Sequence, residues 1–105
     1  MGERTKVAYQ AARSGLVGLT RHTASLAGKG KQGVRCNLLS PGVTLTASSL
    51  ATTTEEWRGE ALASVRFPRL GKPEDMAAMV AFLFSDDAAF INGQSFLVDG
   101  GAHFS

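Results

Sequence analysis

The chain has 105 residues, enough for one domain with a modest core. Its composition, 44% hydrophobic and 19% charged, is typical of a globular chain and excludes a disordered tail. The longest apolar run, residues 76–84, is too short to span a bilayer, and the first residues lack the apolar segment of a secretory signal, so we expect a cytoplasmic protein without a membrane partner.

Charge is distributed unevenly along the chain. The first 35 residues hold seven Lys/Arg and one Glu, whereas the rest hold four Lys/Arg and eight Asp/Glu. Basic residues spread around a helix without stacking aromatics indicate a solvated face, so we expect no nucleic-acid partner. Cys36 is the single cysteine, which excludes a disulfide or a cysteine-based metal site within one chain; its apolar neighbours predict a buried small hydrophobe. We expect no metal.

The first predicted element is an amphipathic helix over residues 7–27, because apolar residues recur there at steps of three and four. These residues are Tyr9, Ala12, Leu16, Leu19, Thr23 and Leu26. Tyr9 and Arg13 lie one turn apart on one face, and a cation beside a phenol favours the phenolate and makes the phenol a usable proton donor. The alternative is a helix that buries Tyr9 in the core and leaves Arg13 in solvent.

Residues 28–33 match the pattern G-x-G-x-x-G letter for letter. In a dinucleotide fingerprint these glycines follow a strand and open a helix. Here they follow a helix and precede a strand, which predicts a helix cap and connector instead.

The next predicted element is a strand over residues 34–40, stopped by Pro41-Gly42. Asn37 is expected to make structural hydrogen bonds at the strand end. Residues 43–46 form a loop in which amides and hydroxyls lie close together. Residues 47–54 are small and hydroxyl-rich, and we expect them to be mobile.

The second half begins with a capping box of Thr53 and Glu56, which predicts a helix through Ser64. A connector over residues 66–71 leads to a helix over residues 74–84, opened by Pro73 at its first position. This helix is apolar almost all round, so it should be buried on several sides. Residues 93–98 form the second strand, and residues 99–101 turn the chain out of it.

Two strands, each preceded by a helix, are typical of the end of a parallel α/β sheet. Four blocks then add up to a resemblance. They are Tyr9-x-x-x-Arg13-x-Gly15 with Leu19-Thr20; residues 33–37 leading into Pro41-Gly42-Val43-Thr44-Leu45-Thr46; residues 69–75; and Val98-Asp99-Gly100-Gly101. In order and spacing they closely resemble the second half of short-chain dehydrogenases/reductases, over nearly the whole chain.

The resemblance implies an α/β fold: the C-terminal part of a doubly wound parallel, Rossmann-like sheet with two strands and three to four helices. Residues 1–105 would form a single partial domain, without the N-terminal dinucleotide-binding half. The chain would belong to an oxidoreductase that moves a hydride between NAD or NADP and a small carbonyl/alcohol substrate.

The resemblance also assigns site residues. Tyr9 would be the general acid/base, and Arg13 stands where the family has a lysine; both would also contact the cofactor. The backbone at Gly42 and Thr44, with the Thr46 hydroxyl, would hold the nicotinamide end. Arg13 keeps the positive charge but cannot relay a proton as lysine can.

Three hypotheses follow from this resemblance. The chain is the catalytic, nicotinamide-facing part of an oxidoreductase, competent only with the N-terminal half; or a non-catalytic interaction module; or a truncated, inactive remnant. The interaction would be a homo-oligomer through the Tyr9-bearing helix, because family members pair through this helix and Gly15 and Gly18 permit close approach.

Overall fold

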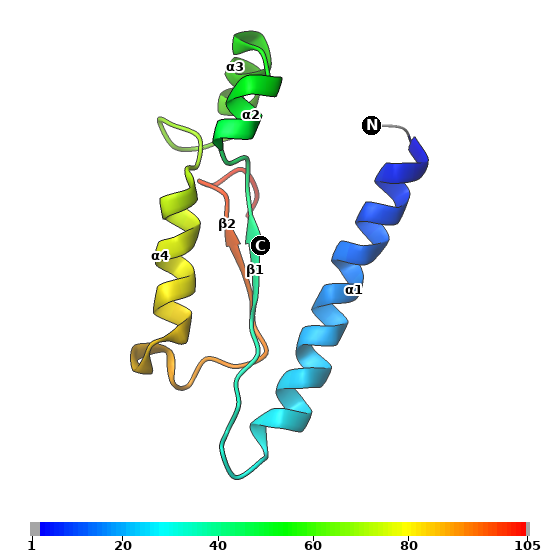
Figure 1. The fold of residues 1–105 in the computed structure, drawn as a ribbon, viewed down its shortest axis with the longest axis vertical. Helices are drawn as coiled ribbons and strands as arrows, with labels where there is room; N and C mark the ends of the chain where they lie inside the picture. The colour runs from blue at the N-terminus through cyan, green and yellow to red at the C-terminus, as the bar shows by residue number, and fades with distance from the viewer. Residues whose placement is uncertain (1–2, 105) are drawn as a thin grey trace. The chain divides into compact units, whose positions relative to one another are not determined.

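A computed structural model describes residues 3–104, with side-chain burial described from residue 7 onward (Figure 1). Contacts divide the chain into two compact units. The first comprises the residues up to Leu38 together with Ala89–Phe96, and the second comprises Leu39–Ala88 with the residues from Leu97 onward. The elements in chain order are α1 (Glu3–Gly28), β1 (Leu38–Pro41), α2 (Ala47–Thr52), α3 (Glu55–Ser64), α4 (Pro73–Phe84), the 3-10 turn η1 (Asp86–Ala88) and β2 (Ser95–Val98). The α/β class and the count of two strands and four α-helices agree with the sequence prediction.

Helix α1 dominates the first unit and buries a face of small residues. Thr20 and Ala24 are buried, and Asn92 Nδ2 donates a hydrogen bond to the Ala24 carbonyl at 3.2 Å. Gly93, at φ +74°, passes so close to Ala24 that an added Cβ would lie 3.3 Å from the Ala24 Cβ. The larger apolar side chains predicted from the periodicity, from Tyr9 through Leu26, lie on an exposed face of the same helix.

The glycine-rich segment after α1 is a connector, as its position predicted. The Gly30 and Val34 amides both donate to the Ala27 carbonyl, at 3.3 Å each, and so close the end of the helix. Gly33 has φ +58°, a conformation that favours glycine. The glycines of residues 28–33 therefore let the chain reverse direction after α1, and they do not form a phosphate-binding loop.

Strands β1 and β2 form a two-stranded parallel sheet. The Leu38 amide donates to the Gln94 carbonyl at 2.8 Å and the Gly42 amide to the Val98 carbonyl at 2.9 Å, so both partners advance by four residues in the same direction. The predicted strand over residues 34–40 was wrong at its start and its end: β1 starts at Leu38 and includes Pro41.

The late start of β1 has a local cause. The Cys36 amide donates to the Asn92 side chain at 2.9 Å instead of to a strand carbonyl, and Asn37 Nδ2 donates to the Ile91 carbonyl at 2.9 Å. The structural role predicted for Asn37 is confirmed. Cys36 is half-buried and not buried as predicted. Strand β2 is likewise shorter than the predicted 93–98, because Gly93 is in the left-handed conformation.

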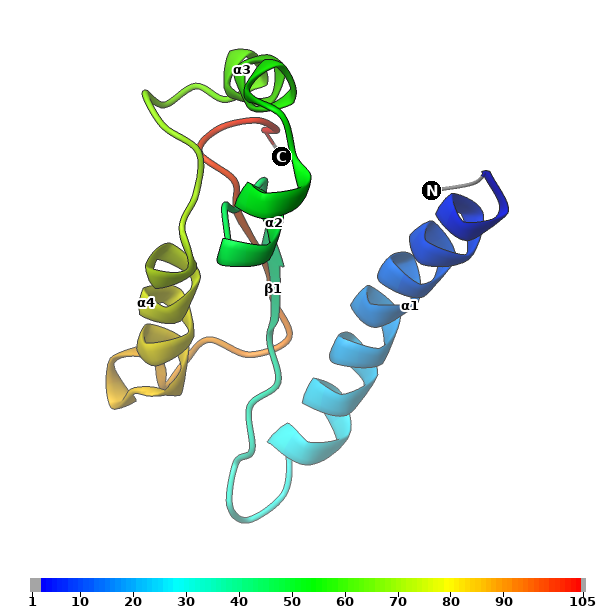
Figure 2. The same cartoon turned by 45° about the horizontal axis from the view of Figure 1, so that its top comes forward.

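No helix was predicted in segment 47–54, which was expected to be mobile, yet it contains α2, which follows directly on β1 and its loop (Figure 2). Thr46 caps α2, and its hydroxyl accepts from the Ser49 amide at 3.1 Å. The capping residue of α3 is Thr54 and not Thr53, since the Trp57 amide donates to the Thr54 hydroxyl at 3.0 Å. Thr53 instead ends α2.

Helix α4 begins at Pro73, as predicted, and runs alongside the strands (Figures 1 and 2). The prediction that it is buried on several sides was wrong, because none of its residues is buried and Phe84 is 84% exposed. Part of its apolar sequence is exposed surface, including Val80 and Phe82, while Met76, Met79 and Leu83 are half-buried. In residues 3–104, no helix combines the length and apolarity that a bilayer crossing requires.

Candidate active site

Tyr9 and Arg13 meet on α1 as their spacing predicted. The Arg13 guanidinium carbon lies 5.5 Å from the centre of the Tyr9 ring, over its face, a cation–π arrangement. Tyr9 is 53% exposed, so the alternative in which it is buried as core is wrong. The phenol is accessible from solvent, and the Arg13 cation lies against its ring.

The second group of predicted residues lies on the loop after β1. The Thr44 hydroxyl donates to the Gly42 carbonyl at 3.0 Å. The Leu45 amide donates to the Gly71 carbonyl at 2.8 Å, and the Gly71 amide donates to the Val43 carbonyl at 3.0 Å. These two backbone bonds, which form a parallel bridge between Thr44 and Gly71, extend the sheet edge and hold the loop in a fixed shape.

Thr46 ends this loop in a reciprocal cap. Its hydroxyl accepts from the Ser49 amide, while its own amide donates to the Ser49 hydroxyl at 2.6 Å. The role of Ser49 in this cap was not predicted from the sequence. The signal was the Thr-x-x-Ser spacing, a capping box in which serine replaces the usual glutamate.

Gly42 makes a close approach to the start of the turn after β2. A Cβ built on Gly42 would lie 2.5 Å from the Asp99 Cβ and 2.6 Å from the Asp99 Cα, so only glycine fits without backbone movement. Because Gly42 has no side chain, the loop can pack directly against Asp99. Sequence reasoning found Gly42 but not this reason.

The side chain of Asp99 is only 7% exposed, and it accepts hydrogen bonds from residues of the C-terminal turn. The Gly101 and His103 amides donate to its carboxylate at 3.1 and 3.0 Å, and the His103 ring lies 3.2 Å away. Desolvation opposes the ionisation of Asp99, but the hydrogen bonds from the His103 ring and the two amides outweigh it and hold the pKa of Asp99 below its ordinary value.

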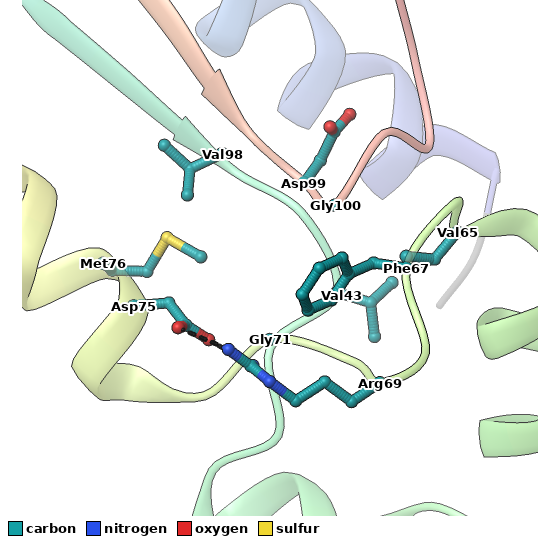
Figure 3. Close-up of a pocket in the computed structure, with 10 residues that line it drawn as sticks. All are labelled: Val43, Val65, Phe67, Arg69, Gly71, Asp75, Met76, Val98, Asp99 and Gly100. Carbon is teal, nitrogen blue, oxygen red and sulfur yellow. Dashed lines mark hydrogen bonds and ion pairs between the residues drawn. The ribbon is translucent and has the colours of Figure 1, made fainter.

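A cavity of about 280 Å³ opens beside this loop within the second unit (Figure 3). Its apolar lining comprises Val43, Val65, Phe67, Met76 and Val98. At its edge Arg69 holds Asp75 through two bonds of 2.7 and 2.9 Å. The Arg69 hydrogen bonds, with help from the Lys72 amide, hold the pKa of Asp75 well below its ordinary value.

The structure thus brings Gly42, Thr44 and Thr46 together on one loop of the second unit, and Tyr9 and Arg13 together on α1 in the first. In residues 3–104 no cluster of three His, Cys, Asp or Glu side chains is arranged to hold a metal ion.

Comparisons with known proteins show the family to which the chain belongs. The family model described as enoyl-(acyl carrier protein) reductase matches residues 1–103. The 7alpha-hydroxysteroid dehydrogenase of Bacteroides fragilis is 43% identical over 93 residues, which cover 89% of this chain and 35% of that protein. Dehydrogenase/reductase SDR family member 4 of Oryctolagus cuniculus is 41% identical over 96 residues, covering 90% of this chain and 36% of that protein.

Solved structures share the fold as well. A 4-hydroxyisoleucine dehydrogenase complexed with NADH and succinate superposes with a TM-score of 0.78 at 34% identity, over 91% of this chain and 38% of that one. A blue fluorescent protein from a metagenomic library, in complex with NADPH, superposes with a TM-score of 0.79 at 35% identity, over 91% of this chain and 37% of that one. This chain thus spans little more than a third of the length of these proteins. From the family-model match and the shared fold together, the chain belongs to the short-chain dehydrogenase/reductase family.

Proposed function

We propose that this chain is the catalytic and nicotinamide-facing part of an NAD(P)-dependent oxidoreductase that interconverts a carbonyl and an alcohol. The observation that carries the proposal is the exposed Tyr9 phenol with the Arg13 cation over its ring. Membership of the family supports it, as do the NADH and NADPH complexes of two similar structures.

In this proposal Tyr9 moves the proton. When a carbonyl is reduced, the phenol gives its proton to the substrate oxygen as a hydride reaches the carbon; in the reverse direction the phenolate takes the alcohol proton. The bound nicotinamide supplies or accepts the hydride. Arg13 stabilises the phenolate left on Tyr9, because its guanidinium stays charged throughout.

The residues on the loop fit the nicotinamide end of the cofactor. Thr46 is exposed, and its hydroxyl can donate to an amide oxygen while still accepting the cap bond from Ser49. Thr44 and Gly42 offer backbone groups on a loop that the Gly71 bonds hold rigid. The 280 Å³ cavity nearby lies in the same unit, and its lining combines apolar side chains with Arg69, Asp75 and Asp99.

Turnover should require the N-terminal half of the family fold. The matched segment corresponds to about a third of the relatives, and the dinucleotide-binding half implied by the resemblance is not among its residues. The test is to join the N-terminal, dinucleotide-binding half of a family member to residue 1. We expect carbonyl-dependent oxidation of NADH or NADPH by the hybrid and none by the 105-residue chain alone; equal rates for the two would contradict the proposal.

A second candidate function is homo-oligomerisation through α1. Leu16, Leu19 and Leu26 lie exposed on the same helix as Tyr9, with Leu19 at 60%. An apolar stripe of this kind is costly in water and is stabilised when a second helix covers it. The two functions are compatible.

A further inference from the structure

Ser49 is the centre of the hydrogen-bond network that shapes the loop carrying Thr44 and Thr46. Its hydroxyl accepts from the Thr46 amide at 2.6 Å and lies 3.2 Å from the Thr46 hydroxyl. It also lies 3.1 Å from the Thr46 carbonyl and 3.5 Å from the Thr44 carbonyl, to which it can donate. The Ser49 amide donates to the Thr46 hydroxyl, and the Thr53 amide donates to the Ser49 carbonyl at 2.9 Å.

The number of protons and lone pairs on the two hydroxyls shows which hydrogen-bonding groups remain free for a ligand. A hydroxyl has one proton to donate and two lone pairs to accept. The Ser49 proton is directed at the loop carbonyls, and one Ser49 lone pair holds the Thr46 amide. One Thr46 lone pair is held by the Ser49 amide. The Thr46 hydroxyl proton is the one group whose partner, the Ser49 oxygen at 3.2 Å, an incoming acceptor can replace without breaking the cap.

We propose that Ser49 is a positioning residue that presents the Thr46 hydroxyl as a hydrogen-bond donor to the carboxamide oxygen of a nicotinamide ring. The inference rests on the proposed function, since it deepens the role given there to Thr46. Ser49 does not touch the ligand. Its hydroxyl holds the Thr46 backbone amide, and its own amide occupies one lone pair of the Thr46 hydroxyl, so that the Thr46 proton is left to be donated to the ligand.

The test uses the 105-residue chain and two probes followed by amide NMR. One probe is nicotinamide mononucleotide, and the other is pyridine mononucleotide, the same molecule without the carboxamide. Wild type should bind the first about three- to tenfold more tightly, the range expected for one hydrogen bond. Ser49→Ala should bring this ratio close to one, whereas Ser49→Thr, which keeps a hydroxyl, should retain it. A merely structural loss would weaken both probes equally and leave the ratio unchanged.

The matched control is Ser48→Ala, the same substitution one residue earlier in α2, at an exposed serine whose hydroxyl takes no part in this network. It should leave the ratio unchanged. A second measurement needs no variant: the Thr46 amide of wild type should exchange with solvent more slowly than the exposed amides in the first turn of α2, because the Ser49 hydroxyl holds it.

The outcomes separate the two proposals. If wild type prefers the carboxamide probe and Ser49→Ala keeps that preference, the inference about Ser49 is overturned while the proposed function stands. If wild type binds neither probe, or both equally, the nicotinamide role of Thr46 is overturned and the Ser49 role with it. If Ser49→Ala unfolds, a fast-exchanging Thr46 amide in wild type overturns the inference and a protected one, with the ratio retained in Ser49→Thr, supports it.

Discussion

At the residue scale, Gly42 shows how packing and function share one position. The family resemblance implies that the backbone of Gly42 contacts the cofactor. The structure gives a separate reason for glycine at this position: Asp99 occupies the space that a side chain would need. Local spacing was enough to predict that Arg13 lies beside Tyr9, because helix geometry alone fixes that neighbour. It was not enough to predict the approach of Gly42 to Asp99, which depends on how distant segments pair.

Gly42→Ala should therefore destabilise the second unit. The new methyl group meets the Asp99 backbone, which cannot move aside as a flexible side chain could, so we expect a loss of about 1–3 kcal/mol in the free energy of unfolding. Urea unfolding measures it. The control is Gly59→Ala in α3, where nothing lies within 4 Å of an added Cβ; this change should stabilise the helix by about 0.5–1 kcal/mol. Equal effects of the two substitutions would refute the close-approach explanation.

At the element scale, the start of α4 is fixed by a network that sequence signals captured only in part. Pro73 predicted where the helix begins, and the Lys72 amide donates to Asp75 at 2.8 Å as an additional cap. The clamp of Arg69 on Asp75 was not predicted. It joins the connector to α4 across a turn, and the sequence alone does not give the shape of that turn. Helix α2 was missed for a related reason: Ser49 replaces the expected acidic residue in its capping box.

The Arg69–Asp75 clamp predicts a pH dependence. The pKa of Asp75 is lower in the folded chain than in the unfolded one, so its contribution to stability is fully present above the unfolded pKa, about 4. That contribution is lost as the pH falls from about 4 through the lower folded pKa. Asp75→Asn should thus lower the free energy of unfolding at neutral pH and flatten its decline below about pH 4, leaving the part due to Asp99.

Denaturant unfolding at several pH values measures this effect. The control is Glu74→Gln, which removes a neighbouring carboxylate in the same helical turn outside the clamp. It should leave the acid-dependent decline as in wild type. An Asp75→Asn profile parallel to wild type below pH 4 would contradict the role given to the clamp.

At the scale of the whole molecule, the chain has little interior of its own. Among the described residues the buried apolar ones are Ala24, Leu70 and Ala88, and no large side chain is fully buried. A core this small stabilises little against the entropy of the ordered chain. Leu16, Leu19 and Leu26 of α1 are exposed as well. Sequence periodicity identified these residues; whether such a face is covered depends on chain segments or copies that no periodicity reveals.

We therefore expect the isolated chain to self-associate through α1. Leu19→Lys places a charge in the apolar stripe and should shift sedimentation toward the monomer. The control is Phe90→Lys, which exchanges a fully exposed aromatic residue outside α1 for the same charge. A sharply melting monomer in wild type would contradict the expectation, as would equal effects of the two lysines.

The most direct measurement of the central claim is the turnover of the hybrid protein after substitution at Tyr9 and Arg13. Tyr9→Phe removes the transferable proton and keeps nearly all of the ring surface, so turnover should fall by about 10²–10⁴-fold with the folded state unchanged by circular dichroism. Arg13→Lys should raise turnover, because a compact ammonium stabilises the phenolate and can also pass on a proton. If Tyr9→Phe turns over as fast as the unsubstituted hybrid, Tyr9 is not the acid/base and the catalytic account is wrong.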